Sequence, residues 1–234
     1  MIKAFQKTSL IDYPGKIVST VFFQGCNFRC PFCHNPDLVI PDRFTDENVE
    51  IEEILSHLID NKMYLDGICI TGGEPTLSHK LLELMRLVKK ENFMIKLDTN
   101  GTNPEVLRKI ISENLADYIA MDVKGPFLKY ENCVGMKTDI SHIKESISMI
   151  KESGIAHEFR TTVVPALHTH ADIIETVKQL DGCTKFSLQQ FRPGKTLEPS
   201  FGKERSYSKT ELEDMRREII AKGYAKECVL KGAE

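Results

Sequence analysis

The sequence predicts an α/β fold in which parallel strands are joined by helices. Six short runs rich in β-branched and aromatic residues recur along the chain, and each is followed by a segment with helical spacing of its apolar residues. This alternation indicates parallel strands, since parallel neighbours need a long crossover connection. The segments that carry polar residues, glycines and cysteines all follow strands. These observations favour an open sheet or a complete or partial barrel.

The predicted strands carry most of the branched apolar residues of the chain. They are residues 16–24, 67–71, 94–100, 117–123, 157–164 and 185–191. The C-terminal "AKECVLKG" is either a tail or an extra edge strand, and its alternation of apolar and polar residues favours the strand.

The predicted helices lie between these strands and after the last of them. Asn103 can cap a helix that opens with Pro104, and Ser208 stands with Glu211 at the capping-box spacing. The helices are residues 49–62, 79–91, 104–114, 139–153, 171–180 and 209–223.

Composition indicates one globular domain over residues 1–234. The chain is 41% hydrophobic and 28% charged, which is ordinary for a protein with a substantial core. A formal net charge of -3 argues against a nucleic-acid partner, because neutralising phosphates takes an excess of Lys and Arg. No window approaches the roughly 18 apolar residues of a membrane span, and the N-terminus lacks the apolar segment of a secretory signal. We therefore expect a cytoplasmic protein without a membrane partner.

In parallel α/β folds, ligands bind at the C-terminal ends of the strands. The six segments that follow the predicted strands are therefore expected at one rim, and they contain most of the chemically distinctive residues of the chain. In order they are "GCNFRCPFC", "GGEP", "DTNG", "DVKG", "VVPALHTH" and "QQFRPG".

The first of these segments holds three of the seven cysteines within eight positions. The other four stand singly, and we interpret them as small buried side chains: Cys69, Cys133, Cys183 and Cys228. The clustered three permit four interpretations, namely a structural zinc, an attached c-type haem, a thioredoxin-like redox pair or an iron–sulfur cluster. They are Cys26, Cys30 and Cys33.

The number of ligands separates these interpretations. A structural zinc takes four ligands, and His34 would have to be the fourth. Because His34 is adjacent to Cys33, the two side chains are poorly placed to share one tetrahedral site. The redox pair and the haem site both leave Cys26 without a use. A four-iron cluster uses all three thiolates and leaves one iron open, as catalytic metal sites leave a position open. The cluster is therefore favoured, and zinc and the redox pair remain alternatives.

The spacing Cys-x3-Cys-x2-Cys, followed about forty residues later by "GGEP", resembles the radical S-adenosylmethionine (SAM) superfamily. The resemblance implies one [4Fe–4S] cluster on Cys26, Cys30 and Cys33. It implies that SAM chelates the open iron through its methionine moiety and is cleaved by an electron from the cluster to a 5'-deoxyadenosyl radical. The further residues that it implies around SAM are Phe32, Gly72, Gly73, Glu74, Asp98, Thr99, Asp122 and Lys124, with a monovalent cation as a further ligand beside the methionine carboxylate.

Within the superfamily, "SLIDYPGK", "GCNFRCPFCHNP", "LDTNG" and "MDVKGP" look like the activating proteins of anaerobic ribonucleoside-triphosphate reductase, and more loosely of pyruvate formate-lyase. This resemblance implies a partial (β/α)6 barrel of the TIM type, with a side opening for a glycine loop of a glycyl radical enzyme. It also implies an electron donor such as flavodoxin or ferredoxin.

The chain departs from the pyruvate formate-lyase activases at the end of the sixth strand. Phe191 stands near the place of their histidine, which leaves Gln189 as a candidate for SAM binding, with Arg192 as a second substitute. A surface or helix-entry role is predicted for the remaining basic residues of the rim: Arg160, His168 and His170.

Two other functions stay open at this point. The chain could be a radical SAM enzyme that acts on a small molecule, or a non-catalytic zinc or thiol-redox module.

Overall fold

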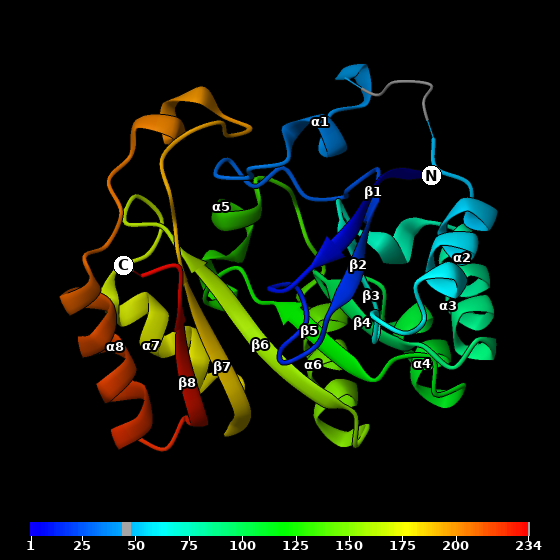
Figure 1. The fold of residues 1–234 in the computed structure, drawn as a ribbon. Helices are drawn as coiled ribbons and strands as arrows, with labels where there is room; N and C mark the ends of the chain where they lie inside the picture. Colours follow the sequence, from blue (N-terminus) through cyan, green and yellow to red (C-terminus); the bar gives the residue numbers. More distant parts are fainter. Residues whose placement is uncertain (44–47, 234) are drawn as a thin grey trace.

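A computed structural model describes residues 1–43 and 48–233, and one eight-stranded sheet runs through these residues in chain order (Figure 1). The first two strands pair antiparallel and all later neighbours pair parallel. The first and last strands are the edges, so the sheet is not closed and forms a partial barrel. The strands are β1 (Ile2–Ser9), β2 (Val18–Phe23), β3 (Gly67–Gly72), β4 (Met94–Thr99), β5 (Tyr118–Asp122), β6 (Ala156–Val163), β7 (Cys183–Gln190) and β8 (Ala225–Lys231).

The six predicted strands are confirmed as β2 to β7. The extra C-terminal edge strand is also confirmed, as β8, which pairs parallel to β7. The sequence prediction missed β1. This strand is largely exposed at the edge of the sheet, and its Lys3, Gln6 and Lys7 weaken the apolar signal that marks a strand.

All six predicted helices are present, and their ends lie within two residues of those expected. The Asn103 side chain accepts a hydrogen bond from the Val106 backbone, and Ser208 and Glu211 form the predicted capping box. The helices are α2 (Ile51–Asp60), α3 (Lys80–Lys90), α4 (Pro104–Ser112), α6 (Ile140–Glu152), α7 (His170–Lys178) and α8 (Lys209–Ala221).

Two short helices, α1 (Pro36–Val39) and α5 (Tyr130–Val134), lie at the end of the sheet where the strands terminate (Figure 1). Single turns of 3-10 helix complete the structure at Pro41–Arg43, Pro75–Leu77, Phe127–Lys129 and Pro199–Lys203. In the described part of the chain, no helix is long and apolar enough to cross a membrane.

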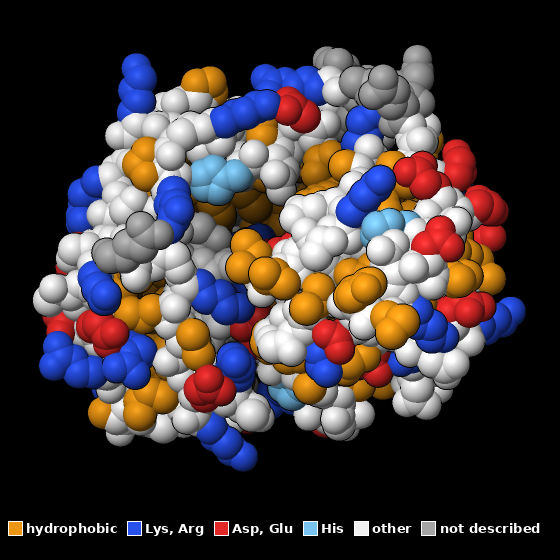
Figure 2. Space-filling model, in the orientation of Figure 1, with side chains coloured by type: hydrophobic (Ala, Val, Ile, Leu, Met, Phe, Trp, Pro, Cys, Tyr) orange, Lys and Arg blue, Asp and Glu red, His pale blue; other side chains and the backbone are white. Residues whose placement is uncertain are grey.

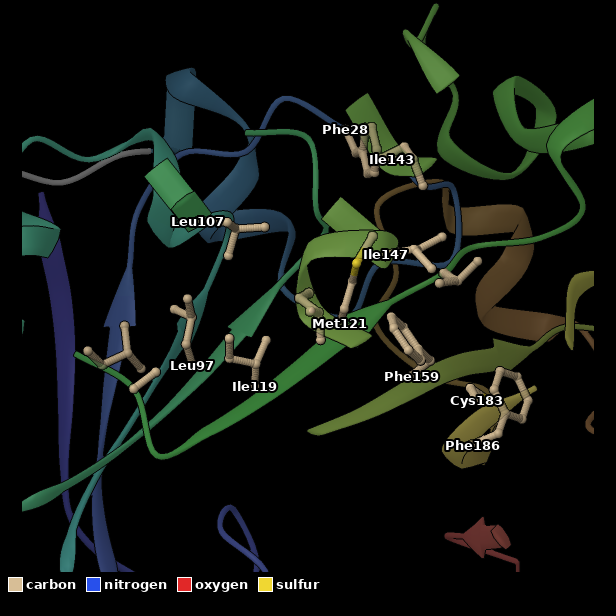
Figure 3. Packing of buried hydrophobic residues seen from close by; sticks show 14 of the residues in the cluster. Phe28, Leu97, Leu107, Ile119, Met121, Ile143, Ile147, Phe159, Cys183 and Phe186 are labelled. Carbon is tan, nitrogen blue, oxygen red and sulfur yellow. The ribbon is translucent and has the colours of Figure 1, made fainter. Parts of the chain in front are cut away.

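The outer face of the sheet packs against the helices and forms the main hydrophobic core (Figure 3). Every second residue of the strands points into this core, as the period of two in a strand requires. Burial of each such side chain contributes on the order of 2 kcal/mol. Labelled members from strands and helices are Leu97, Ile119, Met121, Phe159, Phe186, Leu107, Ile143 and Ile147.

A smaller cluster closes the inner face at the N-terminal ends of the strands. Tyr13, from the turn between β1 and β2, packs beside Val18 and Tyr118, which begin β2 and β5. The Tyr13 and Tyr118 rings lie 5.7 Å apart. The segment "SLIDYPGK" is therefore at the opposite end of the barrel from the cysteines, where the Tyr13 side chain fills the interior of the barrel.

Candidate functional site

A pocket opens at the C-terminal ends of β2 to β6, and this face of the molecule is visibly hollowed, with hydrophobic side chains inside the hollow (Figure 2). All but one of the site residues predicted from the sequence line this pocket. They are Cys26, Cys30, Cys33, Phe32, Gly72, Gly73, Glu74, Asp98, Thr99, Asp122 and Lys124. The residues that were predicted to lie at one rim of the sheet therefore do lie together in the structure.

Gln189 is the exception, because it lines a neighbouring cavity and not the pocket of the cysteines. Its Oε1 accepts a long hydrogen bond, of 3.4 Å, from the hydroxyl of Thr162. Thr162 and His34 line both cavities. Phe191 is fully buried, and its ring stacks on His34 with 5.4 Å between the centroids. His34 is thus held at the boundary of the two cavities.

The cysteine loop after β2 is fastened by backbone hydrogen bonds to three distant segments. The Gly25 N–H donates to the Leu38 carbonyl at 2.8 Å, and the Arg29 N–H donates to the Val134 carbonyl at 2.8 Å. The Cys33 carbonyl accepts from the Leu197 N–H at 2.9 Å. These hydrogen bonds hold the loop in place beside the pocket, so the backbone that carries the cysteines is fixed by contacts outside the loop.

The three thiols line the same pocket. Among residues 1–43 and 48–233, no group of three His, Cys, Asp or Glu side chains is placed to hold a single metal ion. A zinc ion would draw its thiolates to within about 4 Å of one another, since each Zn–S bond is about 2.3 Å. Each cysteine of an iron–sulfur cube binds a different iron, so the cysteines lie farther apart. Three thiols that line one pocket are compatible with such a cluster.

Burial keeps the thiols of Cys26 and Cys30 protonated when no metal is bound. It raises the pKa of Cys26 to about 11, and that of Cys30 to about 12, although the positive charge of Lys124 opposes the rise in both. Iron would have to displace the protons, as metals do when they bind cysteine.

Gly72 and Gly73 let β3 end against the start of the cysteine loop. A β-carbon at Gly73 would lie 2.1 Å from the Gly25 carbonyl oxygen, and one at Gly72 would lie 2.3 Å from that of Phe23. Gly72 also has a φ of 120°, which side-chain-bearing residues rarely adopt. The close approach that these glycines permit is thus made, at least in part, by the protein's own backbone.

The Glu74 carboxylate joins the ends of β3 and β4. It is 1% exposed, and Oε1 accepts hydrogen bonds from the Thr99 hydroxyl at 2.8 Å and the Thr76 hydroxyl at 2.6 Å. Oε2 accepts from the Asn100 N–H at 2.6 Å. Burial raises the pKa of Glu74, and these hydrogen bonds oppose the rise. Thr99 therefore has two positions in the site: its hydroxyl donates to Glu74, and its side chain lines the pocket.

Asp98, Asp122 and Lys124 belong to a network of charges on the inner face of the sheet. Arg160 on β6 lies between the two carboxylates, with Nε 2.5 Å from Asp122 and Nη2 3.1 Å from Asp98. Lys124 lies 2.9 Å from the second oxygen of Asp122, and Lys96 pairs with that of Asp98. Burial alone would raise the pKa of Asp122, but Arg160 and Lys124 hold it well below its ordinary value.

Two basic residues do not lie where the sequence placed them. Arg160 was expected at the surface or at a helix entry, but it lines the pocket, with 12% of its side chain exposed. His168 was given the same role, but it is fully buried. Its Nδ1 accepts from the Val164 N–H, and its Nε2 lies 2.8 Å from the Lys124 carbonyl oxygen. Burial lowers the pKa of His168, which favours the neutral ring. The helix-entry role of His170 is confirmed, since it begins α7.

Comparison with known proteins identifies the superfamily. Residues 20–180 match the model of the Radical SAM superfamily. A "Putative glycyl-radical enzyme activating enzyme" of Methanocaldococcus jannaschii is 34% identical over 99% of this chain and 95% of its own length. The "Pyruvate formate-lyase-activating enzyme" of Clostridium pasteurianum is 28% identical over 79% of this chain and 76% of its own length.

Solved structures share the fold at low identity. Streptococcus suis SuiB bound to the precursor peptide SuiA superposes with a TM-score of 0.71 at 14% identity, and covers 90% of this chain. The present chain spans about half the length of SuiB, at 47%. A domain of a pyruvate-formate lyase-activating enzyme from Bacteroides vulgatus has a TM-score of 0.58 at 13% identity, covering 71% of this chain and 99% of that domain.

The radical SAM superfamily uses a [4Fe–4S] cluster and SAM, and the pocket suits both. Its thiols are the soft ligands that iron–sulfur clusters prefer, and its charged groups suit the amino and carboxylate groups of methionine. The chain belongs to the radical SAM superfamily and, by its similarity over its whole length to a relative of that kind, to the glycyl-radical enzyme activating enzymes within it.

Proposed function

We propose that this enzyme generates a glycyl radical on a partner enzyme, and that the partner is an anaerobic ribonucleoside-triphosphate reductase. The relative at 34% identity over almost the whole chain supports the activase role. The segments "SLIDYPGK", "LDTNG" and "MDVKGP" support the choice of reductase, because they resemble the activating proteins of that class. The observation that carries the proposal is the convergence of three cysteines with "GGEP", "LDTNG" and "MDVKG" residues in one pocket.

In this proposal Cys26, Cys30 and Cys33 hold one [4Fe–4S] cluster. When bound, the cluster supplies the electron that cleaves SAM, so that a hydrogen atom from the partner's glycine α-carbon ends on 5'-deoxyadenosine. The protein's contribution is binding, orientation and exclusion of water.

The pocket residues orient SAM in distinct ways. Gly72 and Gly73 would shape the backbone beside the methionine amino group, and Lys124 would offer its positive charge to the methionine carboxylate. Phe32 is buried beside the cysteines and offers an apolar ring to the adenine. Gln189 lies farther out, in the neighbouring cavity, where it would contact SAM or the incoming loop at the pocket's edge.

We place the enzyme in the cytoplasm, where thiols stay reduced, since all seven cysteines are free. A flavodoxin or ferredoxin is the proposed electron donor. The net charge of -3 supports a protein partner and not a nucleic acid.

The test is glycyl radical formation by the anaerobically reconstituted enzyme. It is incubated with SAM, a strong reductant and the candidate reductase, and electron paramagnetic resonance (EPR) is recorded. A doublet from the glycyl radical is expected, and it should vanish when the target glycine of the reductase is replaced by Ala. SAM cleavage without the doublet would favour a small-molecule substrate instead.

Two cysteine variants give the matched control. Cys30→Ala should lose the cluster and the doublet. Cys228→Ala should keep both, since Cys228 is buried on β8 outside the pocket. Metal analysis should give about four irons per chain with matching sulfide, whereas one zinc without sulfide would contradict the proposal.

A further inference from the structure

Five charged side chains form an alternating chain along the inner face of β4, β5 and β6. Arg160 is at its centre, and each neighbouring carboxylate has one oxygen toward Arg160 and the other toward a lysine. In order they are Lys96, Asp98, Arg160, Asp122 and Lys124. The strand register produces this order, because Asp122 stands opposite Arg160 in the β5–β6 pairing.

The charge balance of this chain disfavours an added metal cation. Three cations and two carboxylates leave one positive charge in a buried place, before any ligand binds. A monovalent cation held by Asp98 and Asp122 would need oxygens that already face Arg160, and would add a second positive charge at short range, where the interior screens poorly. The residues present therefore do not fit the monovalent cation that the sequence resemblance implies.

We propose that Arg160 is the built-in cation of the SAM site. Its guanidinium stands between Asp98 and Asp122 in the place that a monovalent metal ion would need, and the carboxylate of SAM matches the remaining positive charge. SAM therefore binds without an alkali metal ion. The proposal rests on the radical SAM family of the chain and is independent of which partner is activated.

The geometry of the guanidinium suits both tasks. It has five N–H donors in a planar fork, and its ion pairs with the two carboxylates use Nε and Nη2. Nη1 has no partner among the residues that the structure describes. Because Arg160 lines the pocket, these donors can reach a carboxylate bound there. A lysine has a single nitrogen, so it could not bridge the two carboxylates in the same way.

The first experiment measures SAM binding to the wild-type holoenzyme. Equilibrium dialysis with labelled SAM is run anaerobically without reductant, so that SAM is not cleaved. Choline chloride is compared with potassium chloride and sodium chloride at equal ionic strength. The dissociation constant should agree within about twofold in the three salts. Tighter binding beyond this margin in potassium or sodium would overturn the proposal.

The second experiment removes the guanidinium. Arg160→Met should bind SAM about tenfold or more weakly in choline, and potassium or sodium should restore part of the affinity by occupying the vacated place. Unchanged affinity in choline, or a loss that neither ion restores, would contradict the proposal. Arg160→Lys should fall between wild type and Arg160→Met. The control is Arg216→Met, which removes a surface arginine of α8 and should leave binding unchanged.

Iron content and circular dichroism show whether Arg160→Met is folded and loaded. If it is not, the salt comparison on the wild-type enzyme still decides the proposal. Since neither experiment includes a glycyl radical enzyme, failure here is distinct from failure to form a glycyl radical.

Discussion

The two faces of β4, β5 and β6 carry opposite kinds of side chain. Leu97, Met121 and Phe159 point outward and are fully buried against helices. The next residue of each strand points inward and carries a charge: Asp98, Asp122 and Arg160. The same three strands thus build the hydrophobic core on one face and a charged binding surface on the other.

This difference has a physical consequence that measurements can resolve. The stabilisation from apolar burial does not depend on proton binding, whereas a carboxylate whose pKa differs between the folded and unfolded states makes stability depend on pH. A variant of the outer face should therefore lower the free energy of unfolding equally at every pH. A variant of the inner face should change how the free energy of unfolding depends on pH.

The largest effect is expected from Phe159→Ala on the outer face. Removing a fully buried phenylalanine leaves a cavity and should lower the free energy of unfolding by about 3–5 kcal/mol. Urea denaturation of the cluster-free, reduced protein measures this without adding cluster loss to the transition. The loss should be the same from pH 7 to pH 3. A loss below about 1 kcal/mol would mean that this core position is not tightly packed.

Asp122→Asn on the inner face should cost about 3 kcal/mol at pH 7, because it leaves Arg160 and Lys124 without their shared carboxylate. The pKa of Asp122 is lower in the folded state than its ordinary 3.8. Its contribution is therefore complete above pH 4 and decreases as the pH falls below that value. The gap between wild type and variant should narrow between pH 4 and pH 3 in the same denaturation series. A gap that stays constant would assign Asp122 no electrostatic role.

Lys231→Met probes a second inner-face pair, in which Lys231 on β8 lies 2.7 Å from the buried Glu158 carboxylate. Lys231 is 34% exposed, so the expected loss is about 2 kcal/mol at pH 7, less than for a fully buried pair. Burial raises the pKa of Glu158, but Lys231 and its other partners bring it below the ordinary 4.5.

Without Lys231, burial should move the pKa of Glu158 upward, so the gap to wild type should close as the pH falls from that raised pKa toward the lower pKa of Glu158 in the wild type. Lys185→Met is the matched control, because Lys185 on β7 pairs with the exposed Glu227 on β8. That variant should change the stability by less than about 0.5 kcal/mol. Equal losses for the two lysines would show that the burial of Glu158 adds nothing to the strength of its ion pair.

The fold could be predicted from the sequence because the outer face dominates the apolar pattern. Six strands and six helices follow from the alternation, and "AKECVLKG" is strand β8 as expected. The missed strand, β1, lies at an edge and only Ile2 and Ser9 of its eight residues are buried, so its sequence carries a weak core signal. Edge strands are held by backbone pairing, which any residue except proline can provide.

The site was predicted less completely, because partners across strands are invisible in one sequence. The cysteine spacing and "GGEP" identify pocket residues correctly, whereas the surface or helix-entry role predicted for Arg160 is wrong. The sequence does contain a signal for a buried Arg160. Glu158 and Arg160 stand two positions apart in a central strand, whereas a parallel strand covered on both faces is ordinarily apolar along its whole length. Polar residues at every second position in such a strand indicate a charged interior. For His168 no such signal exists, since the backbone carbonyl beside its Nε2 belongs to Lys124, a distant residue in the sequence.

The smallest effect, and the finest probe of the inner face, is expected from Ser187→Ala. The buried Ser187 hydroxyl donates to Glu158 at 2.6 Å. Because Glu158 keeps Lys231 when the serine is gone, the loss should be about 1 kcal/mol, at the low end for a bond to a charged group. Ser148→Ala is the control, since Ser148 makes a similar bond of 2.7 Å to Glu152 on the exposed side of α6. Its stability should stay within a few tenths of a kcal/mol of wild type.

Combined with Lys231→Met, Ser187→Ala should cost more than it does alone, because Glu158 then loses its last strong partner on β7 and β8. Strict additivity of the two losses would show that the serine and the lysine do not stabilise the same carboxylate.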